Sequence, residues 1–228
     1  GPLTHLRVLE LGTLIAGPFC GQLFGDMGAD VIKIEPPGVG DPMRSWGRGL
    51  PVWWSVIARN KRCITLNLRV PAGQELLKRL LQDSDVLIEN FRPGTMEKWG
   101  LDYEVLSAIN PGLVMVRVSG FGQSGPYSSR AGYGSIGEAM GGIRYLAGDP
   151  DRPPSRVGLS IGDSLAATFA CVGALAALHE RDRTGQGQVV DSAIYEAVLA
   201  VMESTVPEYT EGGEIRERSG AILPKTAP

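Results

Sequence analysis

Hydrophobic residues in this chain gather in short runs that are separated by longer segments of helical period. The runs are rich in Val, Ile and Leu and are bounded by Gly, Pro or Asp, a pattern typical of buried strands. The sequence therefore predicts strands at residues 7–11, 31–35, 64–68, 86–90, 114–118 and 189–193.

The segments between these runs carry apolar residues at helical spacing. They predict helices at about residues 19–27, 71–81, 95–99, 103–110, 135–146, 163–185 and 194–204. Pro71 stands at a favourable first helical position, and Arg181 and Arg183 stand in a last turn, where cations suit the helix dipole. Strands that alternate with helices in this way predict an α/β fold with an open, mostly parallel sheet and flanking helices.

The loops that follow the strands are the expected place for a ligand, because open α/β sheets bind ligands beyond the carboxyl ends of their strands. The segments 12–18 and 119–134 are glycine-rich or small-residue loops of this kind, and glycine lets the backbone approach a ligand closely. Residues 36–54 and 148–158 are also expected to be loops, since they are rich in Gly, Pro and polar residues.

Composition limits the classes of protein to which the chain can belong. With 228 residues, 43% hydrophobic and 21% charged, it is expected to bury one core as a soluble globular domain. The net charge of −3 offers no basic patch for nucleic acid. Only His5 and His179 are available as imidazole ligands and no cysteines stand at ligand spacing, so no metal site is expected.

The cysteines and the longest apolar run bear on location. Cys20, Cys63 and Cys171 are odd in number, widely spaced and in apolar surroundings, which favours reduced core thiols and a cytoplasmic protein. No signal peptide is expected, because a strand pattern begins almost at once. The apolar run 164–178 is interrupted by glycine and is shorter than the roughly 20 residues of a membrane span, so we expect a buried helix and no membrane partner.

Asp163 is the strongest candidate for chemistry. It stands at the mouth of the apolar helix expected at 163–185, where a carboxylate is poorly hydrated and faces the positive end of the helix dipole. These conditions suit a nucleophile or a base. The alternative is that Asp163 or Ser164 merely caps the helix, since both residue types are favoured caps.

Three segments together resemble one family. LELGTLIAGPFCGQLFGDMGADVIKIEPPGVGDPMRSWG lies within residues 6–47, DVLIENFRPGTMEKWG begins at residue 85, and VGLSIGDSLAATFACVGALAALHERDRTGQGQ holds Asp163. The chain closely resembles the Rossmann-like large domain of class III coenzyme A transferases over almost its whole length. The resemblance implies that Asp163 is the catalytic nucleophile, that coenzyme A and its acyl thioesters are substrates, and that no cofactor is bound permanently.

The resemblance also implies a set of coenzyme A contacts. Arg92 and Lys98 would meet phosphates, although both could equally be solvated surface charges. Ile15 and Ala16 would lie over the pantetheine and thioester, and Ile15 could equally be core. Lys33 or Arg44 could replace a charged contact that some relatives place at Pro36, and Trp46 could line the site or simply pack. The other implied contacts are Leu66 and Arg69 beside the adenine, Asn90, Phe91 and Tyr133.

Several functions remain open at this point. A transferase would move coenzyme A between carboxylic acids through an aspartyl-CoA thioester, with backbone N–H groups of Gly162 and of the glycines in 120–142 stabilising oxyanions. A related α-methylacyl-CoA racemase would need a histidine where Tyr133 stands, and tyrosine is a poor base at neutral pH. The chain could also be a coenzyme A-binding module. A dinucleotide oxidoreductase is the weakest alternative, because LGTLIAG lacks the required glycine spacing.

The predicted domain organisation follows from the loss of pattern near the end of the sequence. Residues 1–206 are expected to form the coenzyme A-binding large domain, and the polar, Gly- and Pro-punctuated residues 207–228 a linker toward a second domain absent from this chain. The resemblance implies that the absent part supplies a glycine-rich loop over the site. It also implies that the full-length protein forms an interlocked homodimer.

Overall fold

The centre of the molecule is a sheet of six parallel strands. The computed structural model describes residues 1–47 and 49–222. Along the sheet the strands follow the order β3-β2-β1-β4-β5-β6, and each pair of neighbours is parallel. The expected open α/β sheet is thereby confirmed. The strands are β1 (Arg7–Glu10), β2 (Asp30–Glu35), β3 (Lys61–Thr65), β4 (Val86–Glu89), β5 (Val114–Ser119) and β6 (Val189–Ala193).

Side chains alternate along the central strands between two hydrophobic cores. Val86 and Ile88 of β4 face one core, whereas Leu87 between them faces the other. The first core is closed by α1 (Ala16–Asp26) and α8 (Ile161–Thr184), and the second by α3 (Pro71–Leu81), α4 (Thr95–Lys98) and α5 (Tyr103–Ile109). Because both faces are covered, the strands read as continuous apolar runs.

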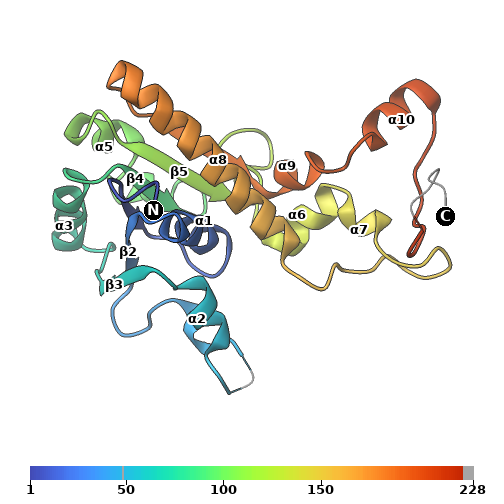
Figure 1. Cartoon of the computed structure of the whole chain (residues 1–228), viewed down its shortest axis with the longest axis horizontal. Helices are drawn as coiled ribbons and strands as arrows, with labels where there is room; N and C mark the ends of the chain where they lie inside the picture. Colours follow the sequence, from blue (N-terminus) through green and yellow to red (C-terminus); the bar gives the residue numbers. More distant parts are fainter. Residues whose placement is uncertain (48, 223–228) are drawn as a thin grey trace.

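Helix α8 crosses the sheet in Figure 1 and packs along a stripe of alanines. Ala166, Ala170, Ala174 and Ala177 recur at helical spacing and are buried, so α8 lies close to β5, β6 and α1. By length and composition α8 is the one helix among residues 1–47 and 49–222 that could cross a membrane. The packed alanine stripe accounts for that composition as a core helix of the sheet.

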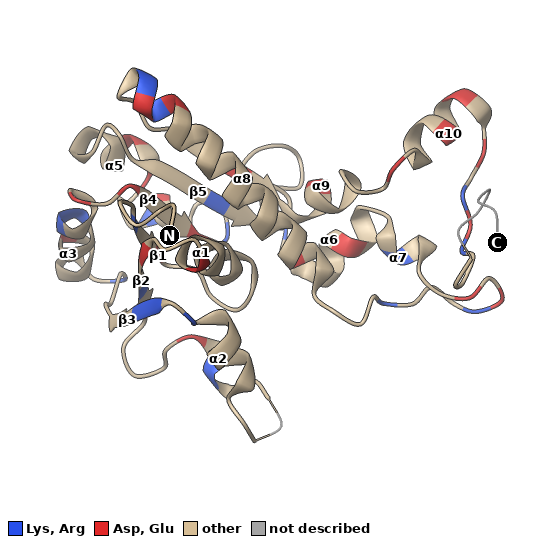
Figure 2. Ribbon diagram, viewed as in Figure 1, with Lys and Arg blue, Asp and Glu red and all other residues tan. Residues whose placement is uncertain are grey.

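Four of the helices beyond β5 extend away from the sheet. In Figure 1, these helices form an arm with α10 at its far end. They are α6 (Gly134–Met140), α7 (Ile143–Leu146), α9 (Ile194–Leu199) and α10 (Thr205–Gly212). One helix was expected over 135–146, but Gly142 has φ of 98° and splits it. In Figure 2, acidic and basic residues are interspersed over the body and the arm.

Several expected boundaries are wrong. The segment 36–54 is not a plain loop, because it holds a 3₁₀ turn at Pro42–Ser45 and the start of α2 (Val52–Ile57). Strand β3 begins at Lys61, three residues earlier than expected, because it pairs in register with β2 from Val31 to Glu35. Helix α10 begins at Thr205 and continues to Gly212, so it crosses the predicted boundary at residue 206 into the segment expected to be irregular. Residues 223–228 of the predicted linker lie outside the described part.

Cys63 also differs from expectation. Cys20 and Cys171 are buried, as predicted for core thiols, but Cys63 is exposed on β3. Strand β3 is the edge strand of the sheet, and its residues from Arg62 to Thr65 are all exposed because they lie outside the two cores.

Candidate active site

A cleft of about 650 Å³ opens where the loops after β1, β4 and β5 meet. This is the carboxyl edge of the parallel strands, where the sequence predicted a ligand site. The arrangement brings together most of the predicted contacts from distant parts of the chain. The predicted residues that line the cleft are Ile15, Ala16, Asn90, Phe91, Arg92, Tyr133 and Asp163, with Trp46 at the same wall.

Asp163 lies in the first turn of α8 and does not cap it. Ser160 holds the cap position, and the helix has no side-chain cap bond, so the capping alternative is wrong. The Ser164 hydroxyl instead donates to the Ser160 carbonyl at 3.0 Å. Because the helix begins at Ile161, the Asp163 carboxylate projects into the cleft and accepts no hydrogen bond from the described residues.

The protein around Asp163 favours the protonated carboxylic acid over the carboxylate more strongly than bulk water does. Burial and, to a lesser degree, the nearby Glu138 carboxylate raise the pKa of Asp163 to about 6, whereas Arg156 acts in the opposite direction. At neutral pH the group is mostly ionised yet poorly solvated. A carboxylate in this condition is more nucleophilic than one in water.

Gly134 makes room for this carboxylate. It begins α6 directly against Asp163, where a side chain would occupy the space of the carboxylate oxygens. Gly162 was expected to supply a free backbone donor, and this expectation is wrong. Its N–H donates to Glu138 Oε1 at 3.4 Å, because Glu138 is buried where α6 packs on α8.

The loop over the cleft is locked by Asn90. Its Oδ1 accepts from the Thr13 N–H at 2.8 Å, and its Nδ2 donates to the Thr13 carbonyl at 2.9 Å. This exchange ties the loop after β1 to the loop after β4. Asn90 therefore lines the cleft, but its amide is engaged with backbone and its role is to position residues 13–16.

A buried ion network holds the same loop from behind. Leu14 adopts φ of 62°, and its N–H donates to Asp41 Oδ1 at 3.1 Å. Asp41 Oδ2 lies 2.9 Å from Lys33 Nζ, which also donates to Glu10 Oε1 at 2.8 Å and to the Gly12 carbonyl at 2.7 Å. All three charged side chains are fully buried.

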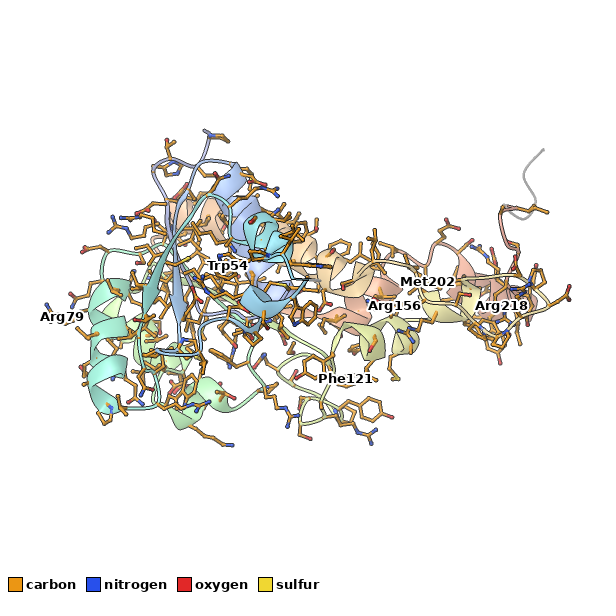
Figure 3. The ribbon with its side chains drawn as sticks, turned by 90° about the horizontal axis from the view of Figure 1, so that it is seen from below. Trp54, Arg79, Phe121, Arg156, Met202 and Arg218 are labelled. Atoms are coloured by element: carbon orange, nitrogen blue, oxygen red, sulfur yellow. The ribbon has the colours of Figure 1, made fainter. Side chains whose placement is uncertain are left out.

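Lys33 and Arg44 are both engaged elsewhere, so neither is available as the replacement charged contact that the sequence suggested. Lys33 is enclosed by the network just described. Arg44 binds both carboxylate oxygens of Glu35, at 2.7 and 2.8 Å, and its guanidinium stacks 3.8 Å from the Trp54 ring centre. Figure 3 labels Trp54 beside the helices of the sheet body. Neither Lys33 nor Arg44 is among the residues that line the cleft.

The loop after β4 presents Phe91 and Arg92. Glu89 accepts from the Phe91 N–H at 2.7 Å and pairs with Arg117 Nε at 2.7 Å, which fixes the turn. Phe91 packs edge-on against Trp99, with ring centres 5.3 Å apart. Arg92 lines the cleft and is exposed, as a phosphate partner must be.

Three predicted contacts lie outside the cleft. Leu66 is partly buried against the second core, and Arg69 and Lys98 are exposed. The structure does not bring them to Asp163. Their expected roles at the nucleotide end of coenzyme A stay predictions.

Four residues near Asp163 were not found from the sequence. Arg130, Arg156 and Ser160 line the cleft, and buried Glu138 faces the site from α6. Arg130 lies 4.1 Å over the Tyr127 ring. The signal for Arg156 was its position in a polar loop close before Asp163, but nothing in that loop's pattern distinguished it from a solvated charge.

Tyr133 lines the cleft with 71% of its surface exposed, and neither histidine does. Among the described residues there is no group of His, Cys, Asp and Glu side chains that could hold a metal ion. The chemistry of the described cleft therefore rests on carboxylate, arginine and hydroxyl groups.

The whole sequence, from residue 3 to residue 228, matches the model of CoA-transferase family III. The chain belongs to CoA-transferase family III. It is 66% identical, over 100% of its length, to succinyl-CoA–D-citramalate CoA-transferase of Chloroflexus aurantiacus, of which it covers 58%. It is 37% identical to succinate–glutarate CoA-transferase of Agrobacterium fabrum, again over 100% of its length and 59% of the relative.

Solved structures agree with this family assignment. A CAIB/BAIF family protein from Brucella suis superposes with a TM-score of 0.92 at 41% identity, over 98% of this chain and 61% of that one. This family III chain thus spans a little more than half the length of the curated relatives it matches.

Proposed function

We propose that the protein to which this chain belongs transfers coenzyme A from a dicarboxylic acyl-CoA, such as succinyl-CoA, to a carboxylic acid. The observation that carries the proposal is Asp163, a half-buried carboxylate without a hydrogen-bond partner among the described residues, set in the cleft of a family III chain. The dicarboxylic class is supported by the names of the relatives, which act on succinyl-CoA or succinate.

The first half of the reaction forms the enzyme thioester. An Asp163 carboxylate oxygen attacks the thioester carbon of the acyl-CoA, and the C–S bond breaks to give a mixed anhydride and the coenzyme A thiolate. The thiolate then attacks the Asp163 side of the anhydride. The donor acid leaves as a carboxylate, and coenzyme A remains bound to Asp163 as an aspartyl thioester.

The second half repeats these steps in reverse. The acceptor carboxylate attacks the aspartyl thioester, which releases the thiolate and forms a second mixed anhydride. The thiolate attacks the acceptor's carbonyl carbon, and Asp163 leaves as the free carboxylate. No proton needs to be moved, which fits a cleft in which no histidine stands among the lining residues.

The remaining groups of the cleft support these steps in the proposal. The loop 13–16, held by Asn90 and Asp41, lies over the reacting thioester, and Arg92 meets a phosphate of coenzyme A. The N–H groups of Gly134 and Ser135, the first two of α6, are assigned to the tetrahedral oxyanions, since the next N–H, of Ile136, already donates to the Tyr133 carbonyl at 2.8 Å. Lys98, Leu66 and Arg69 are assigned to the nucleotide end.

The racemase alternative is disfavoured by the same cleft. A proton shuttle needs a second base that reaches the substrate beside Asp163. Tyr133 lines the cleft as an exposed phenol, and the carboxylate of Glu138 is fully buried and does not line the cleft. We also propose that the full-length protein is a cytoplasmic homodimer. The free thiols of Cys20 and Cys171 in the core support the cytoplasmic location. Sedimentation of the full-length protein tests whether it is a homodimer.

Trapping the aspartyl thioester tests the proposed reaction. The complete polypeptide would be incubated with succinyl-CoA, quenched with hydroxylamine and examined by peptide mass spectrometry. We expect a hydroxamate at Asp163, its absence in Asp163→Ala, and its retention in Asp151→Ala, which alters an exposed loop aspartate. Binding of coenzyme A without any hydroxamate would contradict the reaction and favour a coenzyme A-binding module.

A further inference from the structure

Arg156 places a positive charge at the end of the cleft that holds Asp163, which we call the acyl end. It lines the cleft together with Ser160 and Asp163, and 52% of its side-chain surface is exposed. Its charge acts on the Asp163 carboxylate. In Figure 3, Arg156 lies between the sheet body, where Trp54 is labelled, and the arm that ends near Arg218. It is therefore separate from Arg92, which comes from the loop after β4.

Glu138 anchors this arginine. It is fully buried, and its Oε2 has no hydrogen-bond partner among the described residues. The Nε of Arg156 lies 3.9 Å from Glu138 Oε2, and the Nε of Arg144 lies 3.5 Å from the same oxygen. A buried carboxylate is stable only near compensating charge, so Glu138 holds the base of the Arg156 guanidinium at the cleft.

The outer edge of the guanidinium is only weakly engaged. Nη2 makes long contacts with the Leu159 carbonyl, at 3.5 Å, and with Ser160 Oγ, at 3.4 Å. Nη1 donates to no described residue. The Nε side of the Arg156 guanidinium thus lies beside Glu138, while Nη1 and Nη2 have N–H groups available for a ligand. A guanidinium in this condition can bind a carboxylate through two parallel hydrogen bonds.

We propose that Arg156 determines acyl specificity by binding the distal carboxylate of a short dicarboxylic acyl group whose thioester carbon lies at Asp163. Glu138 is the positioning residue that keeps the guanidinium in place. This assignment rests on the proposed function, because it presumes that the acyl group is seated at Asp163. It goes further by naming the side chain that separates dicarboxylic from monocarboxylic substrates.

Among the described residues that line the cleft, Arg130 is the other arginine without an assigned role. Its guanidinium is stacked on the Tyr127 ring of the same exposed loop, 4.1 Å from the ring centre. No buried acid fixes it toward Asp163. Arg156 is preferred because a specificity contact requires a donor held in place before the substrate binds.

Two unreactive ligands that differ only in the distal group provide the test. The carboxypropyl thioether of coenzyme A imitates succinyl-CoA, and the butyl thioether carries a methyl group in place of the carboxylate. Dissociation constants would be measured with the complete polypeptide. We expect the wild type to prefer the carboxypropyl thioether by about 100-fold, the size of effect that a charged bidentate contact gives.

The variants separate Arg156 from a general effect of charge. Arg156→Gln is expected to abolish the preference, Arg156→Lys to retain about a tenth of it, and Glu138→Gln to lower it about 5-fold because the anchor is lost. Arg152→Gln is the matched control, since Arg152 is an exposed arginine that does not line the cleft, and it should keep the full preference.

Two results would overturn the proposal. One is a wild type that binds both thioethers equally, and the other is an Arg156→Gln variant that weakens both thioethers by the same factor. Because binding requires no reaction, these results are independent of the hydroxamate experiment. A preference that depends on Arg156 without a hydroxamate at Asp163 would refute the transfer reaction and leave the binding role intact.

Discussion

Gly134 and Asp163 are in direct contact across the start of α6, with no space for a side chain between them. A Cβ atom on Gly134 would collide with Asp163 Oδ2, so the glycine defines where the nucleophile can lie. The two residues are far apart in sequence and meet only because α6 and α8 pack together.

Substituting this glycine should disable the site without unfolding the protein. We expect Gly134→Ala to reduce transfer activity at least about 100-fold, because a displacement of the reacting group by about 1 Å can have an effect of this size. Gly158→Ala is the control, since a Cβ there meets nothing within 4 Å. Steady-state kinetics with circular dichroism would measure both. Full activity in Gly134→Ala would show that the contact does not position Asp163.

The rate of transfer should depend on pH through Asp163. Its pKa is raised to about 6 by burial and by Glu138, and only the ionised form can attack. Activity is therefore expected to be full above about pH 7 and to fall as the pH drops through 6. In Glu138→Gln the falling limb should shift to lower pH, because a neighbouring negative charge is removed. An unchanged limb in that variant would argue against control by Glu138.

The free energy of unfolding should fall as the pH rises through the pKa of Asp163, whereas the activity should rise. The pKa of Asp163 is higher in the folded protein than its ordinary value of 3.8, so its ionised form opposes folding above about pH 6 and the penalty disappears below about pH 4. Asp163→Asn should therefore stabilise the protein by about 1 to 2 kcal/mol at pH 8, a discounted value because the group is partly exposed. Urea unfolding at pH 8 and pH 4 would measure the difference. Equal stability of both proteins at pH 8 would contradict it.

The lock between Asn90 and Thr13 should matter for catalysis as well as for stability. Asn90→Ala removes two backbone hydrogen bonds and is expected to cost about 1 to 3 kcal/mol and to raise the KM for acyl-CoA about 10-fold. Asn110→Ala is the matched control. It also removes amide bonds to backbone, to Leu81 and Ser84, but far from the cleft. If both variants changed KM equally, the effect would be one of stability alone.

The buried ion network should tolerate no loss of its central cation. Lys33→Met leaves Asp41 without a cation in the core and leaves Glu10 with Lys61, 2.6 Å from its Oε2, as the remaining partner. We expect a loss of about 3 to 5 kcal/mol in the free energy of unfolding. Lys78→Met is the control, because Lys78 pairs with the exposed Glu75 on the surface and should change stability by less than about 1 kcal/mol. Denaturant titration compares the two. A small effect at Lys33 would show that the network is not needed for stability.

Much of the fold could be predicted because strands and helices are encoded locally. The apolar runs of β1, β2, β4, β5 and β6 and the helical period of α3 and α8 identify these elements, and their alternation predicts a parallel sheet. Boundaries were less certain where backbone packing overrides local pattern. The start of β3 follows its register with β2, and the break between α6 and α7 follows a glycine in the left-handed region.

The sequence by itself determined the fold class, the family resemblance and the position of Asp163 at the start of the apolar helix. The tertiary structure decided which groups surround that carboxylate. Glu138 and Gly134 meet it only through the packing of α6 on α8, and the path of the loop before α8 brings Arg156 to the same cleft. Lys33 is withdrawn from the cleft into the core by Glu10 and Asp41. Hydrophobic period depends on neighbours along the chain, whereas burial, charge pairing and pKa depend on groups that are neighbours only in space.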